Sequence, residues 1–540
     1  MGTGHPEYLR ATYPFQGGSM RRLLVSSVIA VLVGSAFVTP VHAVNMRAIA
    51  TRNLDMEEGA PQIVHGVTAP SDRVPVRQDS GGPAIAYDAT GHVVATRTGA
   101  SARLLRTGFE AGEPTIGIDK SGSIYFQALE GSPAVYRTDD HGRTWKDVSP
   151  QLNGRKRHPE SLDPFLYTDP TTGRTFTYDF LFGCSEISFT DDKGETWTTT
   201  PLNCTLMDHQ NLFAGPPVMS PTAGYPNVVY TCSNQAGATV YSVSASCLKS
   251  LDGGVSWVPT GEPAFVTDMQ KENDLGVAGY CHGAIGHGYV GPDGTVYLPK
   301  GLCGQPFLAI SHDEGATWER VQVSDLGMAQ TEIGVYEHEA SVAADAKGNV
   351  YYFWMGHDRM PYLAISHDEG KTWDKPIMVG PPGIKEAVLP HLDLGSPGKV
   401  AIVYYGSTNS PGKPFPEADD CKPDVVGCFS KLFFLNPPDP KSYRDVTWNA
   451  YMTVTANALD KNPTFYTASI NDPKDPMVRG TCGPIRCKAV YDFIDVSIDS
   501  HGVPWAAYVD ACVQTCAEKG PNNVGDEGVL GTIKGAPSLR

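Results

Sequence analysis

The chain has 540 residues, of which 59 are acidic and 42 basic, and its formal net charge is −17. This charge argues against a nucleic-acid partner, whose phosphates would be repelled, and an anionic substrate would need a local cluster of Arg or Lys. Apolar residues make up 41% of the chain, and it contains 57 Gly and 43 Pro, a composition typical of a globular protein rich in turns.

The N-terminal segment predicts export from the cell. Arg21 and Arg22 precede an apolar run over residues 23–38, and the small residue Ala43 follows shortly after. A basic end, an apolar stretch and a small residue at the exit are typical of a secretory signal peptide. The run is too short for a stable membrane span. We therefore expect residues 1–43 to be an upstream extension and signal peptide, cleaved after Ala43, and the mature protein to be secreted.

A hairpin pattern recurs through the rest of the chain. It consists of an apolar strand, Asp-x-x-Gly and a second strand rich in Tyr and Val. Residues 115–125 and 341–351 have this pattern, and relatives occur at 88–91, 169–173, 292–294 and 499–502. A Gly-containing turn between two alternating apolar strands is typical of a β-hairpin.

A second motif, Ser/Thr-x-Asp-x-Gly-x-Ser/Thr-Trp, occurs five times, at residues 138–145, 190–197, 250–257, 311–318 and 366–373. Its Asp can accept hydrogen bonds from its own turn, its Gly allows a left-handed backbone, and its Trp can pack between sheets. We expect a structural role for its aspartates, Asp140, Asp192, Asp252, Asp313 and Asp368. The Trp residues are 52, 60, 61 and 55 positions apart, the length of one four-stranded sheet with its loops, which predicts a β-propeller.

The number of blades follows from the expected inner strands. Eight candidate starts lie near residues 83, 113, 163, 209, 282, 339, 388 and 492. If residues 60–106 complete the sheet that contains 529–533, both chain ends close one blade and the ring has seven blades; six or eight remain open. Closure removes exposed edge strands. We expect an all-β propeller over residues 82–540, preceded by a lead over residues 44–81.

All twelve cysteines lie beyond residue 183, in the part expected to be exported. An even number of cysteines in an exported protein is typical of disulfides. They form close sequential pairs that would staple hairpins and loops: Cys184/Cys204, Cys232/Cys247, Cys281/Cys303, Cys421/Cys428, Cys482/Cys487 and Cys512/Cys516. Metal binding by the last two pairs is the alternative, but neither has the spacing of a zinc site.

Acidic and His side chains gather where the inner strands are expected to begin. Glu113 and Glu339 each stand nine residues before a hairpin Gly, and Asp163 stands ten before one. The same neighbourhood in other blades contains Asp208, His209, His282, His391 and Asp492. Such residues facing a shared axis are not how a dry core is built, so we predict a polar pocket. The alternative is that they face channel water or bind the backbone of a neighbouring blade.

The five turns and the blade pattern resemble the Asp boxes of the sialidase superfamily of secreted propellers, over about residues 82–535. The resemblance implies glycan processing with an Arg triad, an Asp acid/base and a Tyr nucleophile paired with a Glu, whose position Glu339 matches. The pocket departs from the family. The strand openings at 81–83 and 112–114 keep the Pro but lack the Arg, and Arg359 lies a few residues beyond the expected place.

Two functions follow from these residues. The first is a glycoside hydrolase acting on carbohydrate or a glycoconjugate, with paired carboxylates in catalysis. Its catalytic candidates are Glu113, Asp163, Glu339 and Asp492, and its substrate-binding candidates are Asp208, His209, His282, His391 and Arg359. The second is a non-catalytic propeller that binds glycan or protein and lacks the Arg triad. We expect no cofactor; a metal held by Glu339, His338 and His282 is the alternative.

Overall fold

The structure, a computed structural model, describes residues 62–65, 78–129, 133–152, 155–156, 164–181, 184–202, 207–219, 222–235, 245–263, 265, 284–302, 304–329, 339–413, 441–482, 487, 490–513, 516 and 526–540. The chain divides into residues 1–44 and residues 45–540, and every described residue belongs to the second unit. In this part of the chain, no helix is long and apolar enough to cross a membrane.

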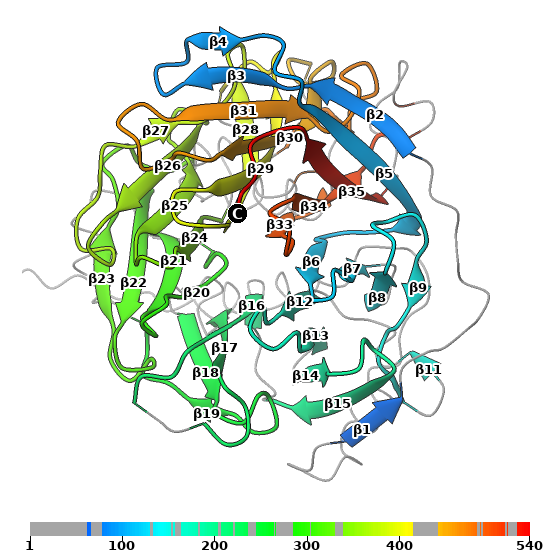
Figure 1. Ribbon diagram of the computed structural model, residues 1–540, viewed down its shortest axis with the longest axis vertical. Coiled ribbons are helices and arrows are strands. Elements are labelled where there is room, and N and C mark those ends of the chain that lie inside the picture. Colours follow the sequence, from blue (N-terminus) through cyan, green and yellow to red (C-terminus); the bar gives the residue numbers. More distant parts are fainter. Residues whose placement is uncertain are drawn as a thin grey trace, which may run out of the picture. The chain divides into compact units, whose positions relative to one another are not determined.

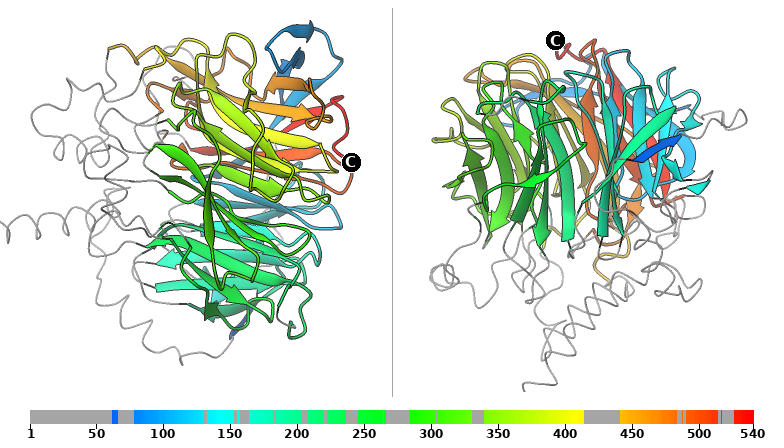
Figure 2. Two further views of the ribbon diagram at one scale, coloured as in Figure 1. Left: turned by 90° about the vertical axis from the view of Figure 1, so that its left-hand side faces the viewer. Right: turned by 90° about the horizontal axis from the view of Figure 1, so that it is seen from below.

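Antiparallel sheets stand around a common axis, and each sheet has one edge strand innermost (Figures 1 and 2). Six of these blades each come from one continuous stretch of chain. The first three are β6 (Thr115–Ile118), β7 (Ile124–Leu129), β8 (Pro133–Thr138), β9 (Lys146–Asp147); β12 (Phe165–Thr168), β13 (Thr175–Leu181), β14 (Cys184–Thr190), β15 (Thr196–Pro201); and β16 (Met207–Gly215), β17 (Val228–Gln235), β18 (Ala245–Ser250), β19 (Val258–Pro259).

The next three blades follow in chain order. They are β20 (Tyr289–Val290), β21 (Val296–Leu302), β22 (Gln305–Ser311), β23 (Glu319–Gln322); β24 (Ser341–Ala344), β25 (Val350–Met355), β26 (Pro361–Ser366), β27 (Ile377–Met378); and β28 (Glu386–Leu394), β29 (Val400–Ser407), β30 (Thr447–Thr455), β31 (Thr464–Ser469). Strand β32 (Val478–Arg479) pairs with β30, and β10 (Gln151–Leu152) forms a separate pair with β11 (Arg155–Lys156).

A composite sheet joins the two ends of the ring. Its inner strands are β33 (Asp495–Ile498), β34 (Pro504–Asp510) and β35 (Glu527–Lys534), and its outer strands are β5 (Ser101–Glu110) and β2 (Gln78–Pro83). The predicted closure by both chain parts is therefore confirmed, and the protein is an all-β propeller. The expected count of seven blades is not supported: six blades are formed by continuous chain, which is one of the counts that the sequence left open, and the composite sheet closes the ring.

Two N-terminal segments extend other blades at their outer edges. Strands β3 (Ile85–Asp88) and β4 (Val93–Ala95) continue the sheet of β28–β31, and β1 (Gln62–His65) pairs with β15. The prediction that an inner strand starts near residue 83 is therefore wrong. The hairpin pattern at 88–91 does form a turn, between β3 and β4. However, β3 pairs with β31, the outer strand of another blade, and covers the edge of that strand.

The five repeated turns share one set of hydrogen bonds. In each, one oxygen of the Asp accepts the backbone N–H four residues later, and the other accepts the hydroxyl of the same residue. The residue after the Asp is left-handed in every turn, with φ between 56° at Glu314 and 73° at Gly253. Burial alone would raise the pKa of Asp252, but hydrogen bonds from Ser256, Ser250 and Val255 outweigh it and lower that pKa.

Three of the six expected disulfides are present. Cys232 and Cys247 face each other on β17 and β18, and the pairs Cys482–Cys487 and Cys512–Cys516 close short loops. Cys184 is also disulfide-bonded. The other expected pairs involve Cys204, Cys281, Cys303, Cys421 and Cys428, which lie outside the described residues.

The repeated turns generate a prediction about stability. Asp252→Ala removes the acceptor of four hydrogen bonds, at 2.5 to 3.1 Å, so we expect it to lower the free energy of unfolding by about 1–3 kcal/mol. Chemical denaturation measures this change. Glu262→Ala, at an exposed position between blades, is the control and should have no effect.

The same turn predicts how this difference depends on pH. Because the pKa of Asp252 is lower in the folded protein, its contribution to stability is present above the unfolded value of about 4 and is lost as the pH falls through the folded pKa. The wild type and Asp252→Ala should converge in stability in strong acid. A difference that stays constant down to about pH 2, well below that unfolded value, would contradict this account.

Candidate functional site

Four of the predicted site residues whose side chains are described lie at the entries of inner strands. Glu113 precedes β6, Glu339 precedes β24, Asp492 precedes β33, and His209 lies near the start of β16, whereas His391 lies in the second half of β28. Asp163, His282 and His338 lie outside the described residues, and of Asp208 only the backbone, in β16, is described. These positions therefore belong to inner strands of different blades.

Irregular backbone aims these side chains. The pairing of β16 with β17 shifts between Asp208 and Asn211, and that of β28 with β29 shifts between Val388 and His391. A shift of this kind bends a strand and redirects its side chains. Left-handed backbone occurs at the same entries, with φ of 48° at Glu113, 52° at His209 and 57° at Leu389. Such φ values are costly for non-Gly residues and are found at functional sites more often than elsewhere.

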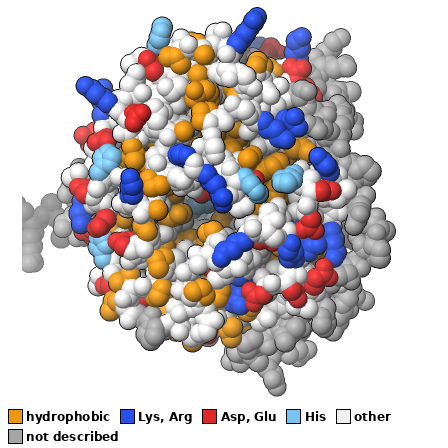
Figure 3. Space-filling model, in the orientation of Figure 1, with side chains coloured by type: hydrophobic (Ala, Val, Ile, Leu, Met, Phe, Trp, Pro, Cys, Tyr) orange, Lys and Arg blue, Asp and Glu red, His pale blue; other side chains and the backbone are white. Residues whose placement is uncertain are grey.

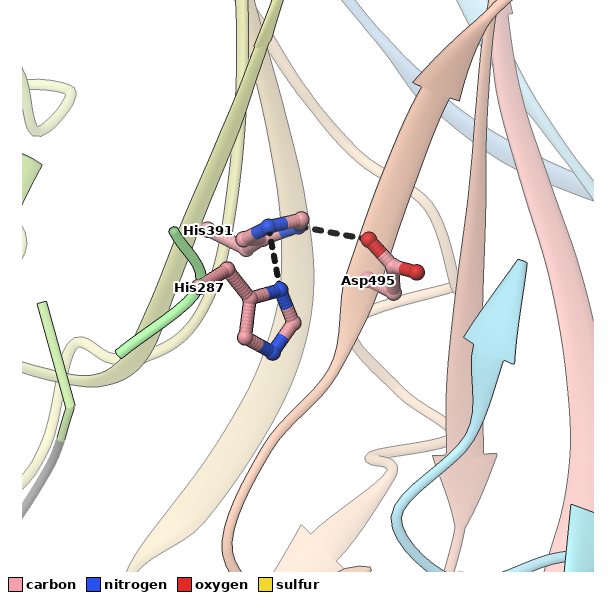
Figure 4. A group of neighbouring side chains, drawn as sticks. All are labelled: His287, His391 and Asp495. Carbon is pink, nitrogen blue, oxygen red and sulfur yellow. Dashed lines mark hydrogen bonds and ion pairs between the residues drawn. The ribbon is translucent and has the colours of Figure 1, made fainter. Parts of the chain in front are cut away.

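A chain of five side chains connects several blades. His209 Nδ1 bonds to Glu339 Oε1, and the other carboxyl oxygen of Glu339 lies 3.8 Å from His287 Nε2. His287 Nδ1 lies 2.6 Å from His391 Nε2, and His391 Nδ1 lies 2.7 Å from Asp495 Oδ1. Figure 4 shows the last three residues, with His391 between the other two. Four separate blades and the composite sheet contribute to this chain.

Asp495 is the hydrogen-bond acceptor at one end of this chain. Its carboxylate accepts the backbone N–H groups of Ile116 and Val496 at 2.8 and 2.7 Å, so it is an acceptor toward His391 as well. The Val496 N–H also lies 3.1 Å from His391 Nδ1, so this N–H is shared between the two side chains. With the proton of His391 on Nδ1, this nitrogen donates to Asp495, and Nε2 accepts the Nδ1 proton of His287. The remaining nitrogen of His287, Nε2, then presents a lone pair toward Glu339.

The surroundings of the chain keep His287 neutral. Phe165 and Phe493 meet its ring edge-on, with centroids 5.0 and 5.7 Å away. Burial, together with the charges of His391 and His209, holds the pKa of His287 well below its ordinary value. A neutral imidazole with a fixed tautomer can accept a proton from a neighbouring acid.

The pKa of Glu339 is shifted in the opposite direction. Burial raises it, the contact with His209 lowers it in part, and the negative charge of Asp492 raises it further. Burial outweighs the favourable contact with His209 because the charged form loses its hydration. Glu339 and Asp492 therefore interact electrostatically, and Glu339 favours its protonated form more than an exposed Glu does.

Gly286 determines the position of His287. A Cβ atom at this position would lie 1.6 Å from the carbonyl oxygen of Ala340, the residue after Glu339. The carbonyl of Gly286 also accepts a hydrogen bond of 2.7 Å from Asn211 Nδ2. Only glycine permits this close approach, which brings His287 beside Glu339.

The sequence analysis missed His287 and Asp495. His287 is flanked by Gly286 and Gly288, both packed tightly against neighbouring blades, and this Gly-His-Gly pattern was the available signal. Asp495 lies three residues after the predicted Asp492 and begins β33. The other prediction, Arg359, lies in the loop between β25 and β26. It is 3% exposed and paired with the buried Glu386, so its role in substrate binding stays a prediction.

Part of the chain could also hold a cation. Ligand atoms of His287, His391 and Asp495 lie within 4.8 Å of one another, the one such group of His, Cys, Asp and Glu among the residues described. The 2.6 Å separation of the two imidazole nitrogens is a hydrogen-bond length. The geometry of this structure is therefore that of a hydrogen-bonded pair of imidazoles next to a carboxylate.

No family model matches the sequence, and no curated protein matches it. Solved structures give distant likenesses. A Dyadobacter fermentans protein of unknown function shares 14% identity over 86% of this chain and 99% of its own, with a TM-score of 0.37. A Penicillium chrysogenum α-L-arabinanase in complex with arabinobiose shares 12% over 62% and 93%, and a leech intramolecular trans-sialidase shares 13% over 78% and 69%, both with TM-scores of 0.37. The fold assignment rests on the sheets themselves, not on these likenesses.

The close approach at Gly286 generates a prediction. Gly286→Ala must push the backbone away from Ala340, so we expect a loss of stability of about 1–3 kcal/mol and a displaced His287. Chemical denaturation and the imidazole NMR signals measure both effects. Gly82→Ala is the control, because a Cβ there meets its nearest atoms at 3.6 Å. Equal behaviour of the two variants would contradict the role given to Gly286.

Proposed function

We propose that the protein is a secreted glycoside hydrolase that acts on carbohydrate or a glycoconjugate, and that Glu339 is its general acid. The observation that carries the proposal is the placement of this buried carboxyl at the centre of a chain of imidazoles, where its pKa is raised. Glycosidic bonds break when a carboxylic acid protonates the leaving oxygen. A carboxyl that keeps its proton toward neutral pH suits that step.

A second carboxylate is needed, and Asp492 is the best candidate. Its charge raises the pKa of Glu339, which is the relationship expected of an acid and a base or nucleophile that share one site. Glu113, buried at the entry of β6, and Asp163 remain further candidates for this role. The distance between the two carboxyl groups determines whether the reaction inverts or retains the anomeric configuration.

The imidazoles support the acid from both sides. His209 binds one oxygen of Glu339 and so fixes the orientation of the carboxyl. His287 faces the other oxygen, and the contacts through His391 to Asp495 hold its ring in place. In this proposal the histidines position the acid, and we expect His391 and His209 also to contact the sugar.

A non-catalytic binding propeller is the second candidate. The contacts of Glu339 favour it, because both carboxyl oxygens already face imidazole nitrogens and Arg359 is committed to Glu386. In that case the strand entries form a rigid polar rim that binds a glycan or a protein. Export from the cell is part of both proposals, and the three disulfides among the described residues support it.

The proposal predicts the effect of removing the acid. Glu339→Gln keeps the shape and the hydrogen bond to His209 but cannot give up a proton, so we expect cleavage of a responsive glycan to fall by about 10²–10⁴-fold. Reducing-end release from a panel of glycans, including sialosides, measures this loss. Glu262→Gln, at the exposed control position, should cleave as the wild type does.

The pH dependence of the activity distinguishes a catalytic role of Glu339 from a purely structural one. Because the acid must be protonated, the activity of the wild type should fall as the pH rises through the raised pKa of Glu339. Asp492→Asn removes a charge that raises this pKa, so any residual activity should fall at lower pH. Binding of glycan without cleavage by any form of the protein would decide for the binding propeller.

A further inference from the structure

A cavity lies at the other end of the composite sheet from the candidate site. Its volume is about 490 Å³, and it is bordered by the turns at 138–145 and 499–502 and by the segment 535–538. Strand β33 connects the two places, since it begins at Asp495 in the candidate site and ends just before Asp499 in the cavity wall. A strand rises about 3.3 Å per residue, so about 13 Å of chain separates these two residues. The cavity is therefore distinct from the site at the strand entries.

Three cations surround this cavity: Arg103 on β5, Arg143 in a repeated turn and Lys534 at the end of β35. All three are exposed. Within the described part of the chain, none of them has an ion-pair partner. Burial and the charges of both arginines lower the pKa of Lys534, so the three cations repel one another. Figure 3, which has the orientation of Figure 1, shows Lys, Arg and His side chains around the middle of the face turned toward the viewer.

One carboxylate, that of Asp499, lines the same cavity, and its oxygens are already occupied. It accepts the backbone N–H groups of His501 and Val503 at 2.8 and 2.9 Å, and the indole N–H of Trp505 at 3.1 Å. These bonds fix the hairpin turn, as in other blades. Three cations against one carboxylate leave a local excess of positive charge in a chain whose net charge is −17.

The wall of the cavity is apolar and firmly packed. Leu105, Val454 and Trp505 line it, and they are 7%, 1% and 4% exposed. The ring of His141 stacks on Trp505, with centroids 5.6 Å apart. A concave apolar surface with a few convergent polar groups is typical of small-molecule sites, and guanidinium groups bind carboxylate and sulfate oxygens in pairs.

We propose that this cavity binds an anionic saccharide, a sugar of one or two rings that carries a carboxylate or sulfate group. The apolar wall suits the face of a sugar ring, and Arg103, Arg143 and Lys534 suit its anionic group. A long polyanion is disfavoured because the rest of the protein repels it. This cavity is separate from the proposed catalytic site at the strand entries. The protein would therefore bind an acidic glycan at one place and act on glycan at another.

Titration calorimetry with galactose 6-sulfate and glucuronic acid tests the proposal, with galactose and inorganic sulfate as comparison ligands. We expect at least one of the two acidic sugars to bind more tightly than both comparison ligands. Arg143→Ala and Lys534→Ala should each weaken that binding about tenfold, the size of one lost charged hydrogen bond. Lys347→Ala is the matched control. This exposed lysine lies in the hairpin turn between β24 and β25, which corresponds in its blade to the turn at 499–502 in the cavity wall.

Other results would overturn the proposal. Equal binding of inorganic sulfate and the sugar sulfate would mean that the cavity is a site for free anions. Binding that Arg143→Ala and Lys534→Ala leave unchanged, or no binding of either acidic sugar, would exclude the cavity as the site. Glu339→Gln should bind these sugars as the wild type does, and a loss in this variant would instead assign the binding to the strand entries. Thermal unfolding of each variant checks that the fold is intact.

Discussion

The antiparallel pairing of β35 with β5 is the constraint on which the rest of the molecule depends. It joins Leu530 to Leu105 and Lys534 to Ser101, so that two parts of the chain more than 400 residues apart complete one sheet. A propeller left open here would expose two unpaired strand edges. Two ion pairs reinforce this junction, in which Arg106 contacts the buried Asp510 at 2.7 Å and the partly exposed Glu527 at 2.8 Å. Burial raises the pKa of Asp510 to about 6, although Arg106 opposes this shift.

Both proposed sites use this composite sheet. At one end, β33 contributes Asp495, the last member of the chain of imidazole and carboxyl groups. At the other end, β5 and β35 contribute Arg103 and Lys534 to the basic cavity. The ring holds the two ends of β33 at a fixed separation.

Local chemistry made much of the fold predictable. The repeated turns are encoded within eight residues, such as 250–257, and their Asp, Gly and Trp each have a role that follows from the side chain alone. The hairpin turns are also encoded in a short local sequence, so counting back from the hairpin Gly correctly placed Glu113 and Glu339 at strand entries. His287 could not be found in this way, because its position depends on the contact of Gly286 with Ala340 in the next blade. The basic cavity was not predicted either, since it unites Arg103, Arg143 and Lys534 only after ring closure.

The protonation state of Glu339 is the centre of the functional account. Its carboxyl is proposed to keep a proton above the pH at which an ordinary Glu loses it, because it is buried beside Asp492 and faces the neutral His287. The most direct measurement is an NMR titration of the Glu339 side-chain carboxyl in the wild-type protein, assigned by comparison with Glu339→Gln. The account predicts a pKa clearly above the ordinary value of about 4.3. A value at or below it would mean that Glu339 is a carboxylate bound to His209, and that the site does not hold a general acid at this position.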